Sequence, residues 1–243
     1  MNSAEPTRNE ILLSIWEHIN ELRKRLFVAV LAFFVCCGIA FNFTSTLLEI
    51  LARPLEGGIN ALVAIEVTEN MGVFLRVSLL TGFIFSLPIL LYELMAFIAP
   101  GLTESEQKWV YIFIPFATIM FVGGVAFTYY VMLPAAIPFL VNFLGIKTTP
   151  RLSNYVEFTT GLMFWIGVCF EMPLVAFLLG KLRLITAGTL ARGWRYAIVG
   201  SAIAAAIITP TADPFNMFLL MLPLMSLYMM SILMVMLARA GEK

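Results

Sequence analysis

The chain has 243 residues, of which 61% are hydrophobic and 12% charged, and its mean hydropathy is +0.95. A soluble domain carries about 25% charged residues, and a globule of this length cannot bury so much apolar surface. This composition excludes a soluble or a disordered protein, so lipid must be the solvent for much of the surface. The formal net charge is zero, which removes the general basic field that nucleic acid requires.

The few cysteine and histidine residues exclude several kinds of site. Cys36, Cys37 and Cys169 all lie in apolar runs without zinc-type spacing, and we interpret them as small apolar residues. The one histidine, His18, cannot supply paired haem ligands or an intramembrane Ser-His pair. The sequence therefore predicts a protein that is not an enzyme and that has no cofactor and no metal site.

The first predicted element is an amphipathic helix over residues 1–25. Thr7 to Glu10 fits a capping box. Apolar residues then recur at helical spacing, at Leu12, Ile15, Trp16, Ile19, Leu22 and Leu26. We expect this helix to lie on the cytoplasmic face and to lead into the first span. The residues alone favour a plain role for Glu21, as a solvated carboxylate paired with Arg25 one turn on.

Six apolar segments follow, and we expect each to cross the membrane as a helix. A span needs about 20 apolar residues to cross about 30 Å. The fifth segment is shorter and covers about 21 Å, so it is predicted to be a short span. The segments run over Leu26–Phe43, Met71–Ile98, Val110–Leu133, Phe158–Leu179, Tyr196–Thr209 and Phe215–Ala238. Residues 26–238 thus form one predicted membrane domain, and residues 239–243 a cytoplasmic tail.

The distribution of lysine and arginine predicts the orientation. The N-terminal segment, the second and fourth loops and the tail carry most of these residues, whereas the outer loops carry only Arg53, Lys147 and Arg151. Both termini are therefore expected in the cytoplasm. The predicted fold class is an all-α polytopic membrane protein with six transmembrane helices. Arg76, at the start of the second span, is expected to snorkel outward.

Two acidic residues near helix ends have a plain structural explanation. Thr103 to Glu106 forms a capping box at the start of the third span, in which Glu106 reaches back to the Thr103 amide. Asp213, followed by Pro214, is placed to cap the last helix. Topology adds an alternative, because Glu21 and Glu106 share the cytoplasmic side and the headgroup depth. A pair of carboxylates there would suit guanidinium groups, which bind bidentately.

Glu171 differs from these acids because it lies inside the fourth span. A charge at the membrane centre costs about 2.5–3.5 kcal/mol. Pro173 lacks an amide hydrogen and frees the Cys169 carbonyl. Either a protonated Glu171 satisfies that broken turn, or the residue is a polar site for a partner helix, an ion or a proton.

The fifth span is rich in small residues that permit close packing, namely Gly200, Ser201, Ala202, Ala204, Ala205 and Ala206.

Several short motifs occur in order along almost the whole chain. They are Glu21-Leu22-Arg23-Lys24-Arg25, Phe97-x-x-Pro100-Gly101-Leu102-x-x-x-Glu106, Phe170-Glu171-x-Pro173 and Thr209-Pro210-x-x-Asp213-Pro214-Phe215, with weaker matches at Arg53-Pro54-Leu55 and Ala126-Phe127-x-Tyr129. In these motifs, and in span count and orientation, the chain resembles the TatC family. Members of that family are the multispanning receptor subunit of the twin-arginine protein translocase.

The resemblance implies a cup-like arrangement of helices in the bacterial cytoplasmic (inner) membrane. It also implies a receptor for the twin-arginine signal peptides of folded cargo, with export driven by the proton gradient. Glu21 and Glu106 would contact the signal peptide, and Phe97 and Pro54 would serve the same binding function. Glu171 would face the concave side of the cup. The implied partners are TatA- and TatB-like single-span subunits in a homo- and hetero-oligomer within the lipid bilayer, with no nucleic acid.

An alternative function is a proton-coupled secondary transporter that uses Glu171. It would need a second buried polar group and an aqueous cavity, and the asparagines of the spans all lie near span ends. An intramembrane enzyme would lack a base beyond His18 and a metal site.

One position departs from the family, because Met229 follows Leu227-Tyr228 where relatives often carry an acid. No polar role is therefore expected there. Asp213 would lie in the periplasmic turn before the sixth span.

Overall fold

The structure is a computed structural model that describes residues 8–101, 104–142, 148–209 and 214–240. In this part of the chain, five helical stretches are long and apolar enough to cross a membrane, and a sixth, Trp194–Ile208, is shorter. The five are Trp16–Phe41, Glu69–Gly101, Gln107–Val141, Leu152–Lys181 and Pro214–Arg239. This confirms the predicted all-α fold and the short fifth segment.

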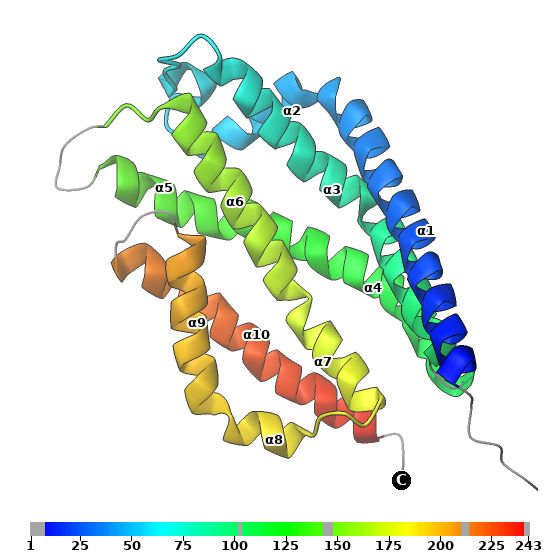
Figure 1. Ribbon diagram of the computed structural model, residues 1–243. Helices are drawn as coiled ribbons and strands as arrows, with labels where there is room; N and C mark the ends of the chain where they lie inside the picture. Colours follow the sequence, from blue (N-terminus) through cyan, green and yellow to red (C-terminus); the bar gives the residue numbers. More distant parts are fainter. Residues whose placement is uncertain (1–7, 102–103, 143–147, 210–213, 241–243) are drawn as a thin grey trace, which may run out of the picture.

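Helix α1 (Arg8–Phe41) runs without a break through the predicted N-terminal helix and the first predicted span (Figure 1). It packs along α3 (Glu69–Ile98). A glycine on α3 allows this close contact, since a Cβ atom built on Gly82 would lie 2.7 Å from the Cα atom of Cys37. Large apolar side chains of α1 that face away from α3, such as Phe27 and Phe34, are exposed, as expected for a helix in lipid.

A short helix that the sequence did not predict, α2 (Thr44–Ala52), follows α1, and the 3-10 turn η1 (Gly58–Ala61) comes after it. Two tyrosines from distant helices hold the end of α2. The Tyr129 hydroxyl donates to the Ile50 carbonyl at 2.9 Å, and the Tyr155 hydroxyl donates to the Leu51 carbonyl at 2.8 Å. A helix end leaves its last carbonyls without regular partners; the Leu51 carbonyl is satisfied by Tyr155, whereas the Ile50 carbonyl accepts from both Tyr129 and the Arg53 amide.

The third predicted span is longer than expected and continues to Val141. It consists of α4 (Glu104–Phe127), the π-helical turn η3 (Thr128–Met132) and α5 (Leu133–Val141), and it follows the short 3-10 turn η2 (Ala99–Gly101). The wide turn lies just before Pro134, whose ring and missing amide hydrogen disturb a regular α-helix. Pro134 therefore lies inside the helical stretch and does not end it.

The fourth predicted span is two helices, α6 (Leu152–Phe170) and α7 (Met172–Lys181), which are separated at Glu171. Close glycine contacts set its packing, because a Cβ atom on Gly124 of α4 would lie 2.9 Å from the Cα atom of Gly167. The remaining helices are α8 (Ala187–Arg192), α9 (Trp194–Ile208) and α10 (Pro214–Ala240). Helix α10 packs on both α7 and α9.

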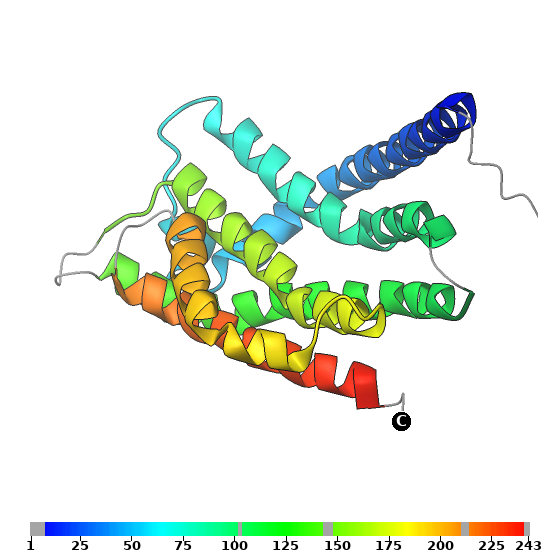
Figure 2. The same cartoon turned by 60° about the horizontal axis from the view of Figure 1, so that its bottom comes forward.

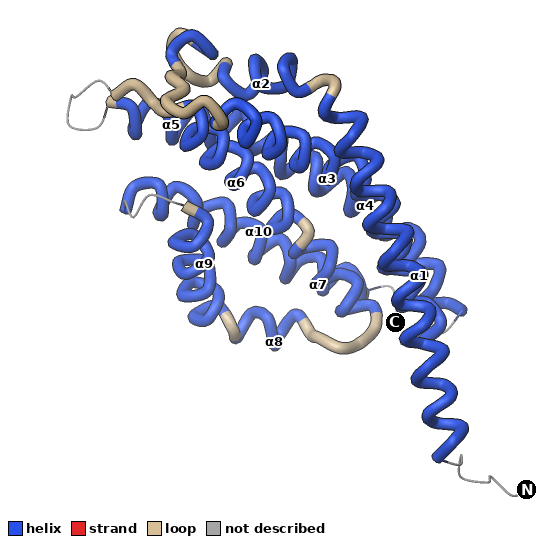
Figure 3. The backbone as a smooth tube through the Cα atoms, turned by 45° about the horizontal axis from the view of Figure 1, so that its top comes forward, coloured by secondary structure: helices blue, strands red, loops and turns tan. Residues whose placement is uncertain are grey.

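The helices form an open arrangement with two walls. Helices α1 and α3 form one wall, α7, α9 and α10 form the other, and α4 and α6 join them (Figures 1 and 2). Two ends can be distinguished. The α2 end holds α2 and the starts of α3 and α6, whereas the Phe97 end holds the starts of α1 and α4 and the ends of α3, α7 and α10 (Figure 3). A groove of about 410 Å³ between α1, α3 and α6 opens along the inside of the first wall.

Candidate functional site

An ion-pair cluster joins α1 to α3 at the Phe97 end. Arg25 donates through Nε and Nη2 to Oε1 of Glu21, at 3.0 and 2.7 Å, and through Nη1 to Oε2 of Glu93 at 3.3 Å. The predicted pairing of Glu21 with Arg25 is therefore present, and the Glu21 side chain keeps 34% of its surface exposed. Sequence reasoning missed Glu93. The sequence feature that could have identified Glu93 is an acidic residue inside an apolar span, one turn before Phe97.

An aromatic contact brings Phe97 to the same place. The rings of His18 and Phe97 stack with centroids 4.4 Å apart and an interplanar angle of 23°. His18 lies one turn before Glu21 on α1, so Phe97 and Glu21 occupy neighbouring turns of one helix–helix contact. The structure thus assembles Glu21 and Phe97, two of the predicted binding residues, with Arg25 and Glu93.

Glu106 lies in the first turn of α4, the helix that follows the end of α3 where Glu93 and Phe97 lie. Its side chain is outside the described residues, as is the predicted capping residue Thr103. The position of the turn is nevertheless fixed by a neighbour, because Gln107 Nε2 donates to the Ala99 carbonyl at 3.0 Å. This bond ties the start of α4 to the end of α3, and therefore to the end of the molecule that carries Phe97.

Two other predicted residues do not join the cluster. Pro54 follows α2 and lines a cavity at the α2 end together with Ile137 and Pro150. That end is separated from Phe97 by the length of α3 (Figure 1). The structure therefore does not bring Pro54 to Glu21. Asp213 lies outside the described residues, although α10 does begin at Pro214, the position expected for a proline in the first turn.

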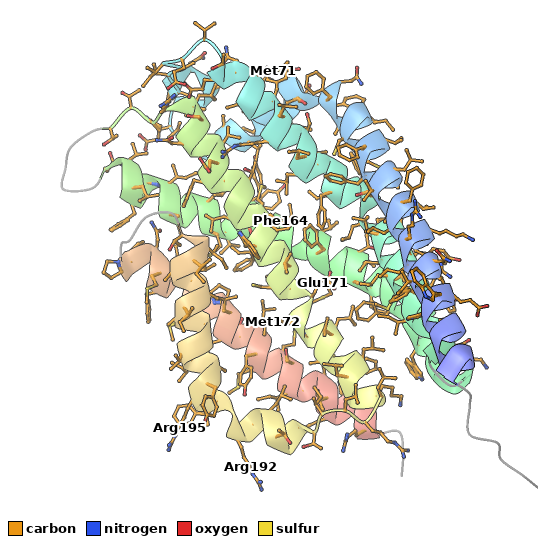
Figure 4. The ribbon with its side chains drawn as sticks, viewed as in Figure 1. Met71, Phe164, Glu171, Met172, Arg192 and Arg195 are labelled. Atoms are coloured by element: carbon orange, nitrogen blue, oxygen red, sulfur yellow. The ribbon has the colours of Figure 1, made fainter. Side chains whose placement is uncertain are left out.

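Glu171 lies at the junction of α6 and α7, near the middle of the molecule (Figure 4). Its backbone closes the turn, since its N–H donates to the Val168 carbonyl at 3.1 Å and its carbonyl accepts from Leu174 and Val175. Both carboxylate oxygens are buried and have no hydrogen-bond partner among the residues that the structure describes. Pro173 therefore breaks the helix as predicted, but the side chain of Glu171 does not satisfy the broken turn.

A second acid cluster, which the sequence did not predict, lies at the α2 end. The Glu69 side chain is 1% exposed, and its carboxylate accepts from the amides of Ile65, Glu66 and Ser153 and from Arg151 Nε. Arg151 also contacts Glu66 at 2.8 Å. Hydrogen bonds to Glu66 and then Glu69 raise the pKa of Arg151 above its usual value. The cluster fastens the loop before α3 to the start of α6.

An exposed ion pair also crosses the groove between α3 and α6. Arg76 Nη1 lies 2.9 Å from Glu157 Oε1, and both side chains are exposed. Arg76 was expected to snorkel outward, but in the structure it reaches across to α6. The pair therefore links two helices within the open groove.

Comparison with known proteins defines the family. The family model described as "Sec-independent protein translocase protein (TatC)" matches residues 17–223. The chain belongs to the TatC family. It is 38% identical over 225 residues to the Sec-independent protein translocase protein TatC of Campylobacter jejuni, covering 90% of this chain and 91% of that protein. Family membership and the apolar helices make the chain a multi-pass membrane protein.

Two further relatives agree with the TatC assignment. The chain is 36% identical over 219 residues to the chloroplastic TATC protein of Pisum sativum, covering 89% of this chain and 62% of that protein. It thus spans somewhat less than two thirds of the pea relative. A crystal structure titled as the twin arginine translocase receptor TatC superposes with a TM-score of 0.79 at 34% identity, covering 91% of this chain and 99% of that one.

Proposed function

We propose that the chain is the receptor and core subunit of a twin-arginine translocase, which recognises the signal peptides of folded proteins for export. Relatives are named as Sec-independent protein translocase proteins, and one solved structure is titled a twin arginine translocase receptor. The proposed location is the bacterial cytoplasmic membrane, with both termini in the cytoplasm. The Phe97 end then faces the cytoplasm, where signal peptides arrive.

The contact between Arg25 and Glu21 is the observation that carries this proposal. Glu21 already accepts two N–H groups from one guanidinium, and among the described residues these bonds use only its Oε1 atom. The remaining oxygen and the exposed part of the side chain are available to a second guanidinium. Arginine suits such a site because its planar fork donates in a fixed geometry, whereas a lysine ammonium is a point charge.

The neighbouring groups can complete a site for two consecutive arginines. Glu106, on the adjoining first turn of α4, supplies the second predicted carboxylate. The stacked rings of His18 and Phe97 offer an aromatic surface on which a guanidinium can lie. In this proposal the two carboxylates bind the arginine pair and Phe97 orients it. Pro54 would act at a distance, because it lies at the opposite end of the molecule.

Binding of a fluorescent signal peptide to the purified protein tests the proposal. We expect Glu21→Gln and Glu106→Gln each to weaken binding of an Arg-Arg peptide at least about tenfold, because charge-assisted bonds are lost. A Lys-Lys peptide should bind the unaltered protein similarly weakly. Glu66→Gln, an exposed acid at the α2 end, is the matched control and should bind normally. Equal affinity for Arg-Arg and Lys-Lys peptides would contradict the proposal.

Single-span TatA- and TatB-like subunits are the proposed partners, with α9 as a docking edge. Ser201, Ala205 and Ile208 face the interior, whereas Val199 and Ile203 on the other side are exposed. The helix has 15 residues, about 22 Å at 1.5 Å per residue, and is shorter than the hydrocarbon core of about 30 Å. Such mismatch favours association with another helix.

A glycine on α9 provides a clean test of this edge. A Cβ atom on Gly200 would meet nothing within 4 Å, so Gly200→Leu should leave the monomer folded. Ala204 instead packs against the core, and Ala204→Leu serves as the control for damage to the monomer. We expect Gly200→Leu to abolish crosslinks to single-span subunits without lowering the melting temperature. Intact crosslinks in that variant would exclude docking at this face.

Glu171 is the proposed intramembrane polar site for such a partner. Its carboxylate is buried without a hydrogen bond within the described chain, and a polar group in this state marks a functional position in membrane proteins. A donor from an arriving helix would satisfy it.

A further inference from the structure

A second groove lies on α4, α7 and α10 and is almost entirely apolar. It has a volume of about 270 Å³. On α4 it extends from Trp109 to Met120, Leu174 of α7 forms part of its floor, and Met234 of α10 lies on its far side. Eleven residues of helix rise about 16 Å, which is about half of the 30 Å hydrocarbon core. The groove therefore has the depth of one leaflet, measured from the Phe97 end.

Basic residues gather where the groove reaches the Phe97 end. The Lys181 ammonium lies 5.0 Å from the centroid of the Trp109 ring and donates to the Ala238 carbonyl at 3.1 Å. Lys108 precedes Trp109, and Arg239 follows Ala238. Among the side chains that the structure describes, Lys108, Lys181 and Arg239 form no ion pair. The mouth of the groove is thus positive and not neutralised by the described acids.

We infer that this groove binds one anionic phospholipid, with an acyl chain along α4 and α7 and the phosphate at Lys181. An acyl chain matches the apolar lining, and tryptophan and lysine at one end match the headgroup level. A spanning partner helix fits less well, because the residues that line the groove extend only to Met120 on α4 and Pro173 on α7, about the depth of one leaflet. The inference goes beyond signal-peptide recognition and does not depend on it.

Native mass spectrometry of the full chain in an uncharged detergent tests the inference. At equal concentrations and with identical acyl chains, we expect phosphatidylglycerol to form about five times as many one-lipid adducts as phosphatidylcholine. Lys181→Gln should reduce the phosphatidylglycerol adduct to the phosphatidylcholine level, and Lys181→Arg should restore it. Met234→Trp, which fills the groove, should reduce the adducts of both lipids. Thermal unfolding of each variant shows whether the chain is still folded.

The chain contains a matched control for the lysine. Arg195 also lies over a tryptophan, 5.7 Å from the Trp194 ring centroid, at the same end of the molecule but outside the groove (Figure 4). Arg195→Gln should leave the lipid adducts unchanged. An equal loss in Arg195→Gln and Lys181→Gln would show general surface attraction and overturn the inference, as would equal binding of the two lipids.

Two further outcomes would assign the groove to a different ligand. Glycerol phosphate carries the same headgroup chemistry without an acyl chain, and it should not displace phosphatidylglycerol when added in molar excess. Displacement would show a phosphate site that does not use the groove. A single-span helical peptide that expels the lipid from the unaltered protein, but fails to bind Met234→Trp, would make the groove a helix-docking site and overturn the lipid assignment.

Discussion

The α2 end and the Phe97 end use their charged residues in opposite ways. At the α2 end the Glu69 carboxylate is buried and accepts four hydrogen bonds from its own chain. At the Phe97 end Glu21 is partly exposed and bonds the described residues through one of its two oxygens, and between the ends Glu171 has no hydrogen-bond partner in the same part of the chain. Buried polar groups are normally paired, so a satisfied group indicates structure and an unsatisfied group indicates a binding role.

The two ends also differ in the number of buried residues that join their helices. The α2 end contains most of the core, where α2, α3, α5, α6, α9 and α10 contribute buried residues. Toward the Phe97 end, a smaller cluster of Met95, Phe113 and Ala117 connects α3 and α4. The end with the larger core and the satisfied acids is therefore expected to determine stability. The other end carries the proposed signal-peptide site.

Breaking the Glu69 cluster should have the largest effect. Glu69→Ala removes one carboxylate, leaves three backbone amides without their acceptor, and leaves Arg151 with Glu66 as its remaining described ion-pair partner. Removing one member of a buried charged network is strongly destabilising. We expect the melting temperature in detergent to fall by about 10 °C or more. Glu66→Ala is the control, because Glu66 is 64% exposed and exposed ion pairs contribute little. Similar melting temperatures for both variants would contradict this interpretation.

Removing the hydroxyl that holds α2 should have a smaller effect. Tyr155 is buried, and Tyr155→Phe would leave the Leu51 carbonyl without its donor while keeping the ring. A buried group left unsatisfied costs about 1–3 kcal/mol, which corresponds to a fall of roughly 2–10 °C in melting temperature. Tyr129→Phe provides the comparison, because Tyr129 is only partly buried and should lose less. A larger loss in Tyr129→Phe would reverse this order.

Much of the fold could be predicted because apolar run length is a strong signal in a membrane protein. The six segments and the break at Pro173 follow from composition and from the missing amide of proline. Helix α2 could not be predicted, since its nine residues are held by tyrosines from α6 and η3 that lie far along the chain. The extension to Val141 was missed because Pro134 lies in the first turn of α5, directly after the π-helical turn η3, and the helical stretch continues through it.

The residues of the candidate site likewise divide into those that the sequence could indicate and those that required the fold. Glu21, Phe97 and Glu171 were found because an acid or a motif near or inside a span is conspicuous in the sequence. Glu93 and Glu69 were missed, because their roles depend on Arg25 and Arg151, which lie 68 and 82 residues away. The sequence placed Pro54 in an outer loop and Glu21 on the cytoplasmic side, and in the structure Pro54 follows α2, whereas Glu21 lies with Arg25 and Glu93 at the Phe97 end. Pairings between distant residues require the fold.

Freeing Glu21 should alter binding more than stability. Arg25 occupies Glu21 much as an arginine of a signal peptide would, so Arg25→Gln removes an internal competitor. Partly exposed ion pairs contribute about 0–1 kcal/mol, and we expect an Arg-Arg peptide to bind about two- to fivefold more tightly. The melting temperature should change little. Arg23→Gln, on the same helix without a described ion pair, is the control. Weaker binding in Arg25→Gln would mean that Arg25 positions Glu21 and does not compete for it.

Neutralising Glu171 should have the smallest effect on stability. Its carboxylate makes no hydrogen bond to the described residues, so Glu171→Gln removes no described bond and replaces a group that is costly to bury as an anion. We expect the melting temperature to stay within about 2 °C of the original or to rise. Glu171→Leu should behave alike in the isolated protein, but only Glu171→Gln should retain crosslinks to single-span subunits, since leucine cannot form a hydrogen bond with them. A fall as large as that in Glu69→Ala would show that Glu171 stabilises the fold as Glu69 does. It would contradict the assignment of Glu171 as a binding residue.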